Sequence, residues 1–199
     1  MLSADCYPMT KTAYMLVQPG YADWEPASAL AELRRTFGFS VKTMGLRAEP
    51  VESMGGLKVT PDLTLSQFVP DSATILILPG GDSWMSAEIP EVSKALLAMS
   101  VLDRPVAAIC AATLAVAHCG LLDNRFHTSN GKDFITSHVK KYRGQEFYRP
   151  VPAVSDRFVI TANGLAPISF AAAIFRVLAP ERESDIAMYE QLFARGVLD

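Results

Sequence analysis

Hydrophobic residues along the chain fall into short runs that end at glycine, proline or aspartate. Five runs have the length of a buried strand: residues 13–20, 38–45, 73–81, 104–110 and 157–164. Longer segments lie between them, and residues 25–38 place Ala29, Leu30, Leu33 and Phe37 at helical spacing. Further helices are predicted over 90–103, 167–180 and 181–197. The chain is therefore predicted to alternate strands and helices.

This alternation predicts an α/β fold with a mostly parallel sheet. The runs are apolar at successive positions, so both sheet faces are expected to be covered by helices, in an open, doubly wound sandwich. Residues 50–65 have the short alternating pattern of a small hairpin, and a late hairpin is expected around Ser155-Asp156. We expect residues 1–11 to form a flexible tail and 12–199 to form one domain.

The composition and charge indicate which binding partners to expect. The chain is 50% hydrophobic and 20% charged, with a formal net charge of -3, so nucleic acid and anionic membranes are not expected partners. The start has no basic-then-apolar order, and Ser169 and Arg176 interrupt the most apolar late stretch. A cytoplasmic protein that acts on a small molecule is the expectation.

Cofactors and metals are not expected from the motifs. The three cysteines, Cys6, Cys110 and Cys119, have neither metal-ligand spacing nor an even number for a disulfide framework. No GxGxxG follows the first predicted strand, and no phosphate-binding GxxxxGK occurs. No cofactor is therefore implied.

Cys110 lies in "PVAAICAATLAVAHCG", between a predicted strand and a predicted helix. Free cysteine often packs as a small hydrophobe, which is the simpler interpretation of this residue taken alone. Ligands of such sheets, however, bind beyond the carboxyl ends of the strands, where Cys110 falls. The amino terminus of the following helix is expected to lower the pKa of the thiol and favour the nucleophilic thiolate.

Two further loops are predicted to meet Cys110. "LILPGGDSW" ends a neighbouring strand in Gly80 and Gly81, and the Gly81 and Ala111 N–H groups are candidates for an oxyanion site. The alternative is that Gly-Gly only makes a turn. "QPGYADWEPA" brings Asp23 and Glu25 beside another turn, where an acid either starts a helix or exchanges protons with the thiol.

Taken together, "LILPGG", "AAICAAT" and "ITANGLAPISFA" resemble the ThiJ/PfpI superfamily, the cysteine branch of the class I glutamine amidotransferase-like fold. The resemblance covers nearly all of residues 12–179. It implies a flavodoxin-like three-layer sandwich, a nucleophile elbow at Cys110, a family acid at Glu25, an oxyanion pocket near Gly81 and Ala111, and a homodimer.

One departure places the usual catalytic dyad in question. The family often has a histidine after the elbow helix, and "RFHTSNGKD" has Asn130 at the aligned position, which indicates a branch without that histidine. Asparagine can orient a substrate by hydrogen bonds but cannot act as a base. His118 is predicted to be too far along the helix, and His127 is a minor candidate to replace the histidine. The segment that contains His138 is not assigned to an element of the predicted fold.

Three functions follow from these residues. The first is a cysteine-dependent hydrolase, hydratase or amidotransferase-like enzyme, with Cys110 as nucleophile, Glu25 moving the proton, and Gly80, Gly81, Ala111 and Asn130 around the oxyanion or pocket. The second is an oxidative-stress sensor that uses the same thiol. The third is a catalytically silent binding protein. Trp24 and Trp84 are candidate apolar walls, and packing is the alternative for both.

Overall fold

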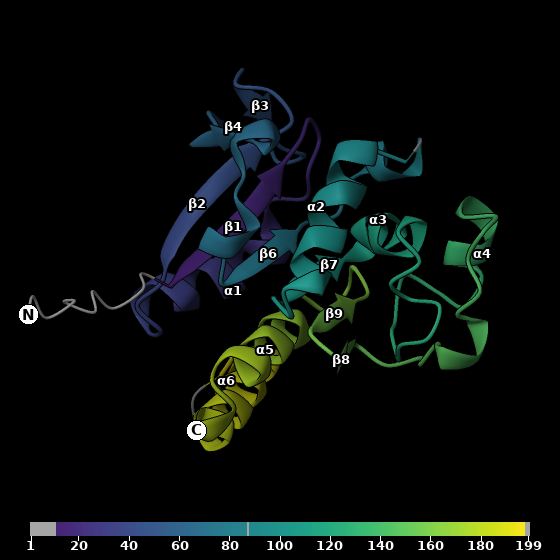
Figure 1. Cartoon of the computed structure of the whole chain (residues 1–199). Helices are drawn as coiled ribbons and strands as arrows, with labels where there is room; N and C mark the ends of the chain where they lie inside the picture. The colour runs from purple at the N-terminus through teal and green to yellow at the C-terminus, as the bar shows by residue number, and fades with distance from the viewer. Residues whose placement is uncertain (1–10, 87, 198–199) are drawn as a thin grey trace, which may run out of the picture.

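The computed structural model describes residues 11–86 and 88–197, so the predicted tail lies outside the described residues except for Lys11. A seven-stranded sheet forms the centre of the molecule, in the order β5-β2-β1-β6-β7-β9-β8 (Figure 1). Its strands are β1 (Thr12–Val17), β2 (Ser40–Gly45), β5 (Leu63–Thr64), β6 (Ile75–Leu78), β7 (Val106–Ile109), β8 (Ala153–Asp156) and β9 (Val159–Ala162). All the pairings are parallel except that between β8 and β9.

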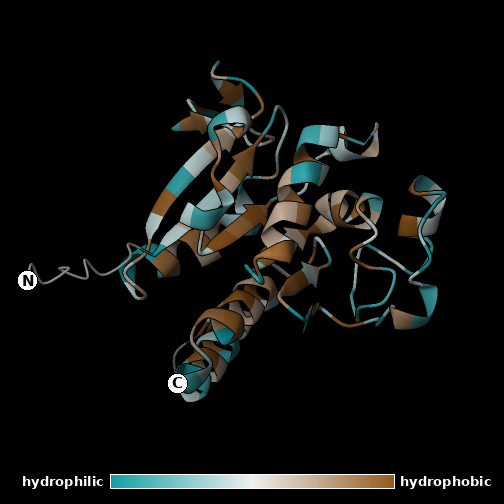
Figure 2. Ribbon diagram, in the orientation of Figure 1, coloured by the Kyte–Doolittle hydropathy of each residue, from teal (hydrophilic) through white to brown (hydrophobic). Residues whose placement is uncertain are grey.

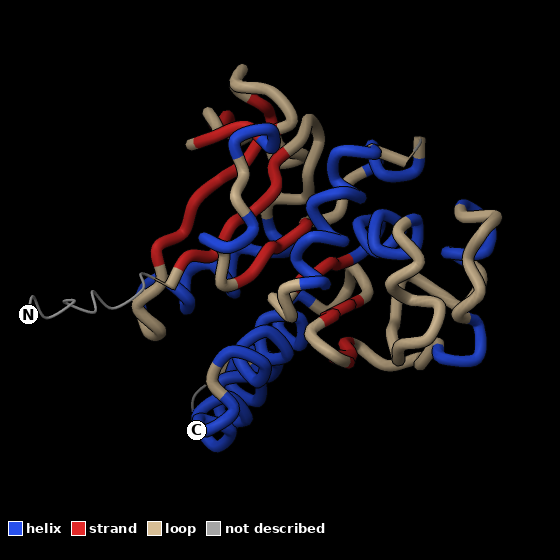
Figure 3. Tube along the Cα trace, viewed as in Figure 1, coloured by secondary structure: helices blue, strands red, loops and turns tan. Residues whose placement is uncertain are grey.

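Helices cover both faces of this sheet (Figure 3). One face packs against α1 (Trp24–Arg35) and α5 (Pro167–Leu178), with α6 (Glu183–Arg195) outside them. The other face packs against α2 (Pro90–Val101) and α3 (Thr113–His118), and α4 (Phe134–His138) lies beside α3. The doubly wound α/β sandwich predicted from the sequence is thus confirmed.

The central strands explain why two helical layers are needed. In β6, Leu76 and Leu78 join the core under α2, whereas Ile75 and Ile77 join the core under α5. All four are at most 1% exposed. Successive side chains of a strand point to opposite faces, so an uninterrupted apolar strand must be buried on both sides. Figure 2 shows that α5, which packs against this sheet, is also largely hydrophobic.

The two predicted hairpins have different outcomes. The small one is confirmed, since β3 (Val51–Glu52) and β4 (Lys58–Val59) pair antiparallel. The late one exists, but its turn is not at Ser155-Asp156 as predicted. Asp156 pairs with Val159, and the turn residues are Arg157 and Phe158, with φ of 45° and 66°. Two left-handed residues make the tight turn that matches strand twist, and the sequence lacks the Asn-Gly that usually marks it.

The segment after Cys110 also differs from the expected continuous helix. A 3₁₀ turn over Cys110–Ala112 precedes α3, which ends at His118. The segment with His127 lies outside the sheet, where His127 forms an isolated bridge with Tyr148. None of the described helices is long and apolar enough to cross a membrane.

The two-sided core gives a stability prediction on α2. Leu96 is 0% exposed, and its neighbour Leu97 is 44% exposed. We expect Leu96→Ala to lower the free energy of unfolding by about 2–5 kcal/mol, since it leaves a cavity between α2 and the sheet. The matched variant Leu97→Ala should lose less than about 1 kcal/mol. Urea unfolding of both variants measures the difference, and equal losses would contradict this placement of α2.

Candidate active site around Cys110

Cys110 occupies a strained turn directly after β7. Its φ is 60°, in the left-handed region that is unfavourable for a residue with a Cβ. The Thr113 hydroxyl donates a hydrogen bond of 2.7 Å to the Cys110 carbonyl, which fixes the turn from the first residue of α3. The strand, sharp turn and helix form the elbow predicted at this cysteine, and the side chain remains partly exposed.

Two glycines let neighbouring loops approach the cysteine. A Cβ on Gly80, after β6, would lie 2.7 Å from the Cβ of Cys110 and 2.7 Å from Oε2 of Glu25. A Cβ on Gly164, after β9, would lie 2.8 Å from Sγ of Cys110. Both distances are below those that real Cβ atoms adopt, so these positions require glycine for the observed packing. The loops after three adjacent strands therefore converge on one sulfur.

Glu25 is the acidic residue that reaches the thiol. It lies in the first turn of α1, is 1% exposed, and its Oε2 accepts a hydrogen bond of 2.6 Å from the Gly80 N–H. Burial raises the pKa of this carboxyl, although hydrogen bonds from the Gly80 N–H and the Cys110 side chain act in the opposite direction. The other predicted acid, Asp23, instead accepts hydrogen bonds from Ser53 and Gly55 in the β3–β4 hairpin.

Asn130 also contacts the cysteine. Its Nδ2 donates to Sγ of Cys110 at 3.1 Å, and its Oδ1 accepts a hydrogen bond of 2.9 Å from the Gly164 N–H. The loop that carries Asn130 is held by a hydrogen bond of 2.7 Å between the Ser129 and Thr113 hydroxyls. One amide side chain thus uses its donor and its acceptor to connect the thiol with the loop after β9.

The pKa of the Cys110 thiol differs from the sequence expectation. Burial raises it, the charge of Glu25 adds to the increase, and hydrogen bonds from Asn130 and the Ala111 N–H oppose it. The expected lowering by a helix amino terminus is therefore wrong in direction. The physical reason is that the sulfur lies between buried groups and a carboxyl, and only a 3₁₀ turn and six residues of α3 follow it.

The expected oxyanion groups are distributed differently from the prediction. The Gly80 N–H is used by Glu25. Gly81, with φ of 150°, packs against the backbone of Gly20 and Tyr21, where a Cβ would lie 2.8 Å from the Gly20 carbonyl oxygen. The Ala111 N–H lies near the cysteine sulfur and lowers the pKa of the thiol. Asn130 contacts the sulfur as well, so the donors gathered there are Ala111 and Asn130.

None of the three histidines contacts Cys110 in the described part of the chain. His127 is 0% exposed, and its ring nitrogens bond the Arg125 carbonyl at 2.7 Å and the Tyr142 hydroxyl at 2.6 Å. His118 lies 3.6 Å from Glu88, and His138 bonds the Phe134 carbonyl. The hypothesis that His127 replaces the family histidine is therefore wrong, because both of its ring nitrogens are used by Arg125 and Tyr142.

A cavity of about 680 Å³ opens over Cys110. Its lining comprises Trp24, Glu25, Cys110, Thr128, Ser129, Asn130, Gly131, Tyr148, Pro150, Val151, Pro152, Asn163, Gly164 and Leu165. Of the two candidate walls, Trp24 belongs to it, whereas Trp84 is 3% exposed and donates to the Pro79 carbonyl. Sequence reasoning missed Ser129 and Leu165, whose types carry no recognisable signal of a site.

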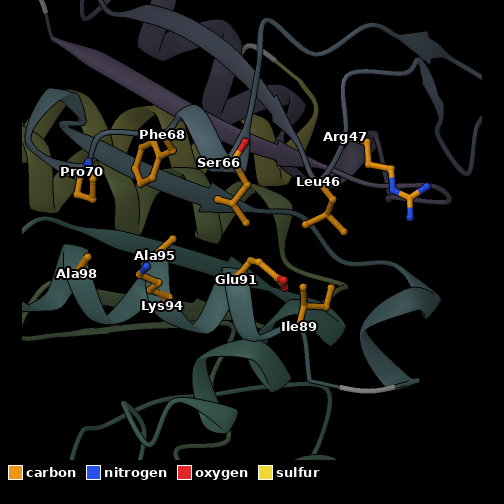
Figure 4. A pocket seen from close by; sticks show the side chains of 11 residues that line it. Leu46, Arg47, Ser66, Phe68, Pro70, Ile89, Glu91, Lys94, Ala95 and Ala98 are labelled. Carbon is orange, nitrogen blue, oxygen red and sulfur yellow. The ribbon is translucent and has the colours of Figure 1, made fainter.

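A second cavity, of about 650 Å³, lies between α2 and the loop after β5 (Figure 4). Apolar side chains such as Phe68 and Ile89 form part of its lining, and Arg47, Glu91 and Lys94 contribute charged groups. None of the predicted site residues lines it. No cluster of three or more potential metal ligands occurs among the described residues.

Comparison with known proteins finds relatives that match most of the chain. An uncharacterized protease of Bacillus subtilis, YoaZ, is 36% identical over 182 residues, which are 86% of this chain and 87% of the relative. The glutathione-independent glyoxalase DJR-1.2 of Caenorhabditis elegans is 26% identical over 180 residues, 88% of this chain and 94% of that protein.

A crystal structure of a DJ-1 superfamily protein from Agrobacterium tumefaciens is 36% identical and covers 90% of this chain and 97% of its own, with a TM-score of 0.82. This likeness confirms the flavodoxin-like sandwich that the sequence motifs imply. A model of the DJ-1/PfpI family matches residues 11–177. From its fold, its elbow cysteine and these matches, the chain belongs to the DJ-1/PfpI family.

Proposed function

We propose that this protein is a cysteine-dependent enzyme that acts on the electrophilic carbon of a small molecule, as a hydrolase, hydratase or amidotransferase-like catalyst. The observation that carries the proposal is the convergence of the Glu25 carboxyl and the Asn130 amide on the Cys110 side chain, beside Gly80 and Gly164. A cavity of about 680 Å³ above the sulfur has the size of a small-molecule site. The protease and glyoxalase names of two relatives are compatible with attack on a carbonyl carbon.

Glu25 serves as the base in this proposal. The raised thiol pKa favours a protonated Cys110 at rest, with the thiol donating to the Glu25 carboxylate. When a carbonyl compound binds, Glu25 takes the thiol proton, the S–C bond forms, and the carbonyl π electrons move to oxygen. The proton then passes from Glu25 to that oxygen or to the leaving group. No histidine is required for this sequence.

Asn130 has two roles in the proposal. Its Nδ2 stabilises the developing thiolate, and together with the Ala111 N–H it is placed to donate to the oxyanion once the sulfur is bonded to carbon. Its Oδ1 is occupied by the Gly164 N–H, which fixes the orientation of the amide. In this proposal, Asn130 allows the site to work without the histidine that is usual in the family.

A second candidate function is an oxidation sensor at the same thiol. The raised pKa of Glu25 is the observation that favours it, because a protonated carboxyl can donate a hydrogen bond to a sulfinate on Cys110. Peroxide is the oxidant, and each of the two oxidation steps from thiolate to sulfinate consumes one peroxide and releases one water or hydroxide.

Removal of either reacting group is expected to abolish turnover. In a screen of small aldehydes, esters and amides, Cys110→Ser should lose activity by at least about a hundredfold, and Glu25→Gln by about 10²–10⁴-fold. Glutamine keeps an oxygen for the Gly80 N–H, so the fold is expected to persist. Cys119→Ser is the matched control and should retain activity. Turnover that survives Cys110→Ser would rule out this mechanism.

The Asn130 contact predicts a shift in thiol reactivity with pH. The pKa of Cys110 is raised, so labelling by iodoacetamide should have a midpoint above the ordinary value of about 8.5. Asn130→Leu removes a hydrogen bond that favours the thiolate, and the midpoint should move higher still. Peptide mass spectrometry against pH measures both, with Cys119 as an internal reference because burial raises its pKa to about 11. A wild-type midpoint well below 8.5 would place the proton on Glu25 instead.

The sensor candidate predicts an order of oxidation. Cys110 should reach the sulfinic acid in mild peroxide before Cys119 is modified. Burial raises the pKa of Cys119 to about 11, so little of it is thiolate, and its Sγ donates to the Ala115 carbonyl at 3.1 Å. Mass spectrometry of native protein follows both sites. Oxidation of Cys119 first, or at the same rate, would count against the sensor.

A further inference from the structure

Exposed apolar side chains surround the opening of the Cys110 cavity. Trp24 is 49% exposed, Val151 is 41% exposed and Leu165 is 97% exposed, and all three line the cavity that contains the cysteine. Single exposed hydrophobic residues are ordinary on protein surfaces. Three of them line the cavity that contains one thiol, where they offer apolar surface to a ligand. We call these three residues the apolar rim.

The apolar rim is carried by the same backbone that builds the site. Trp24 directly precedes Glu25 at the start of α1, and Leu165 directly follows Gly164. The Leu165 N–H donates to Oδ1 of Asn163 at 3.0 Å, so this exposed residue has a fixed backbone. The carbonyl of Val151 accepts a hydrogen bond of 2.9 Å from the hydroxyl of Thr128, another residue of the lining. Hydrogen bonds thus hold the backbones of Leu165 and Val151 at the cavity opening.

Charge in the cavity is of one sign. None of the lining residues is lysine, arginine or histidine, and Glu25 is the one carboxyl among them. The adjacent Arg149 is engaged elsewhere, because its guanidinium lies 4.2 Å from the ring centre of Phe126 and donates to the carbonyls of Glu146 and Tyr148. An anionic substrate would face Glu25 without a compensating cation, which is unfavourable in a partly desolvated cavity.

We propose that Cys110 acts on uncharged electrophiles with a hydrophobic body, which packs on Trp24 and Leu165 while the reacting carbon meets Sγ. This inference rests on the proposed function and adds the substrate class and two specificity-determining residues to it. Asn130, a polar residue of the same lining that contacts Sγ, binds the reacting end. The apolar rim holds the remainder of the molecule.

Matched alkylating agents test the proposal without knowledge of the natural substrate. In each reaction Sγ forms a bond to carbon, the C–I bond breaks, iodide leaves with the bonding electrons, and the thiol proton goes to Glu25 or to solvent. Rates at Cys110 are measured for iodoacetamide, iodoacetate and N-benzyl iodoacetamide, with glutathione as the reference under the same conditions. Relative to glutathione, we expect at least about a tenfold bias against iodoacetate and a saturable rate increase for the benzyl compound.

Two variants assign these preferences to the apolar rim. Leu165→Lys should relieve the bias against iodoacetate, because it places a cation at the cavity opening. Val101→Lys is the control, since Val101 is 83% exposed on α2, lies outside the cavity, and gives the same net charge. Trp24→Ala should lower the ratio of the rate with the benzyl compound to the rate with iodoacetamide.

If the three reagents had the same relative rates with Cys110 as with glutathione, the proposal would be overturned. So would equal effects of Leu165→Lys and Val101→Lys, which would assign the bias to net charge alone. A benzyl compound that reacts more slowly than iodoacetamide would show that the rim is covered, for example by a second copy of the chain, and would also overturn it. These rates are independent of turnover, so failure of the enzyme proposal appears separately, as activity that does not depend on Cys110.

Discussion

The close approach of three loops to the Cys110 side chain is the constraint on which the site depends. Gly80 and Gly164 come so near the cysteine that neither position has room for a Cβ, and Cys110 itself has the left-handed backbone of a sharp elbow. A left-handed backbone at a non-glycine residue is unfavourable by roughly 1–2 kcal/mol and persists only where surrounding packing determines it. Here that packing comes from β6, β7 and β9, whose carboxyl ends lie side by side in the parallel sheet.

Burial decides the electrostatics of this site. Glu25 is buried and Cys110 is partly buried beside it, so the charged form of each is disfavoured and both pKa values are raised. Hydrogen bonds from Gly80 to the carboxyl and from Asn130 to the sulfur compensate in part. The result is a neighbouring carboxyl and thiol, each with a raised pKa. Asn130 joins this pair to the loop after β9, because an amide has a donor and an acceptor at the same end.

Much of the fold was predictable from local pattern. The five predicted runs became β1, β2, β6, β7 and β9. Four of these strands are buried at every position, as a strand between two helical layers must be, whereas β2 is only partly buried. The late hairpin was predicted with its turn misplaced, since nothing in "AVSDRFVI" indicates that Arg157 and Phe158 adopt left-handed backbones. Register in that hairpin depends on the pairing of Asp156 with Val159, which is a contact between strands.

The sequence by itself determined the order of strands and helices along the chain, the elbow at Cys110 and the family motifs around it. Each of these is encoded in neighbouring residues, by apolar spacing or by glycine next to a strand end. Only the tertiary structure decided that Glu25 and not Asp23 meets the thiol, that the Gly80 N–H is used by Glu25, and that burial raises the thiol pKa. These outcomes depend on distances between loops far apart in the chain and on the desolvation they produce together, which no single segment encodes.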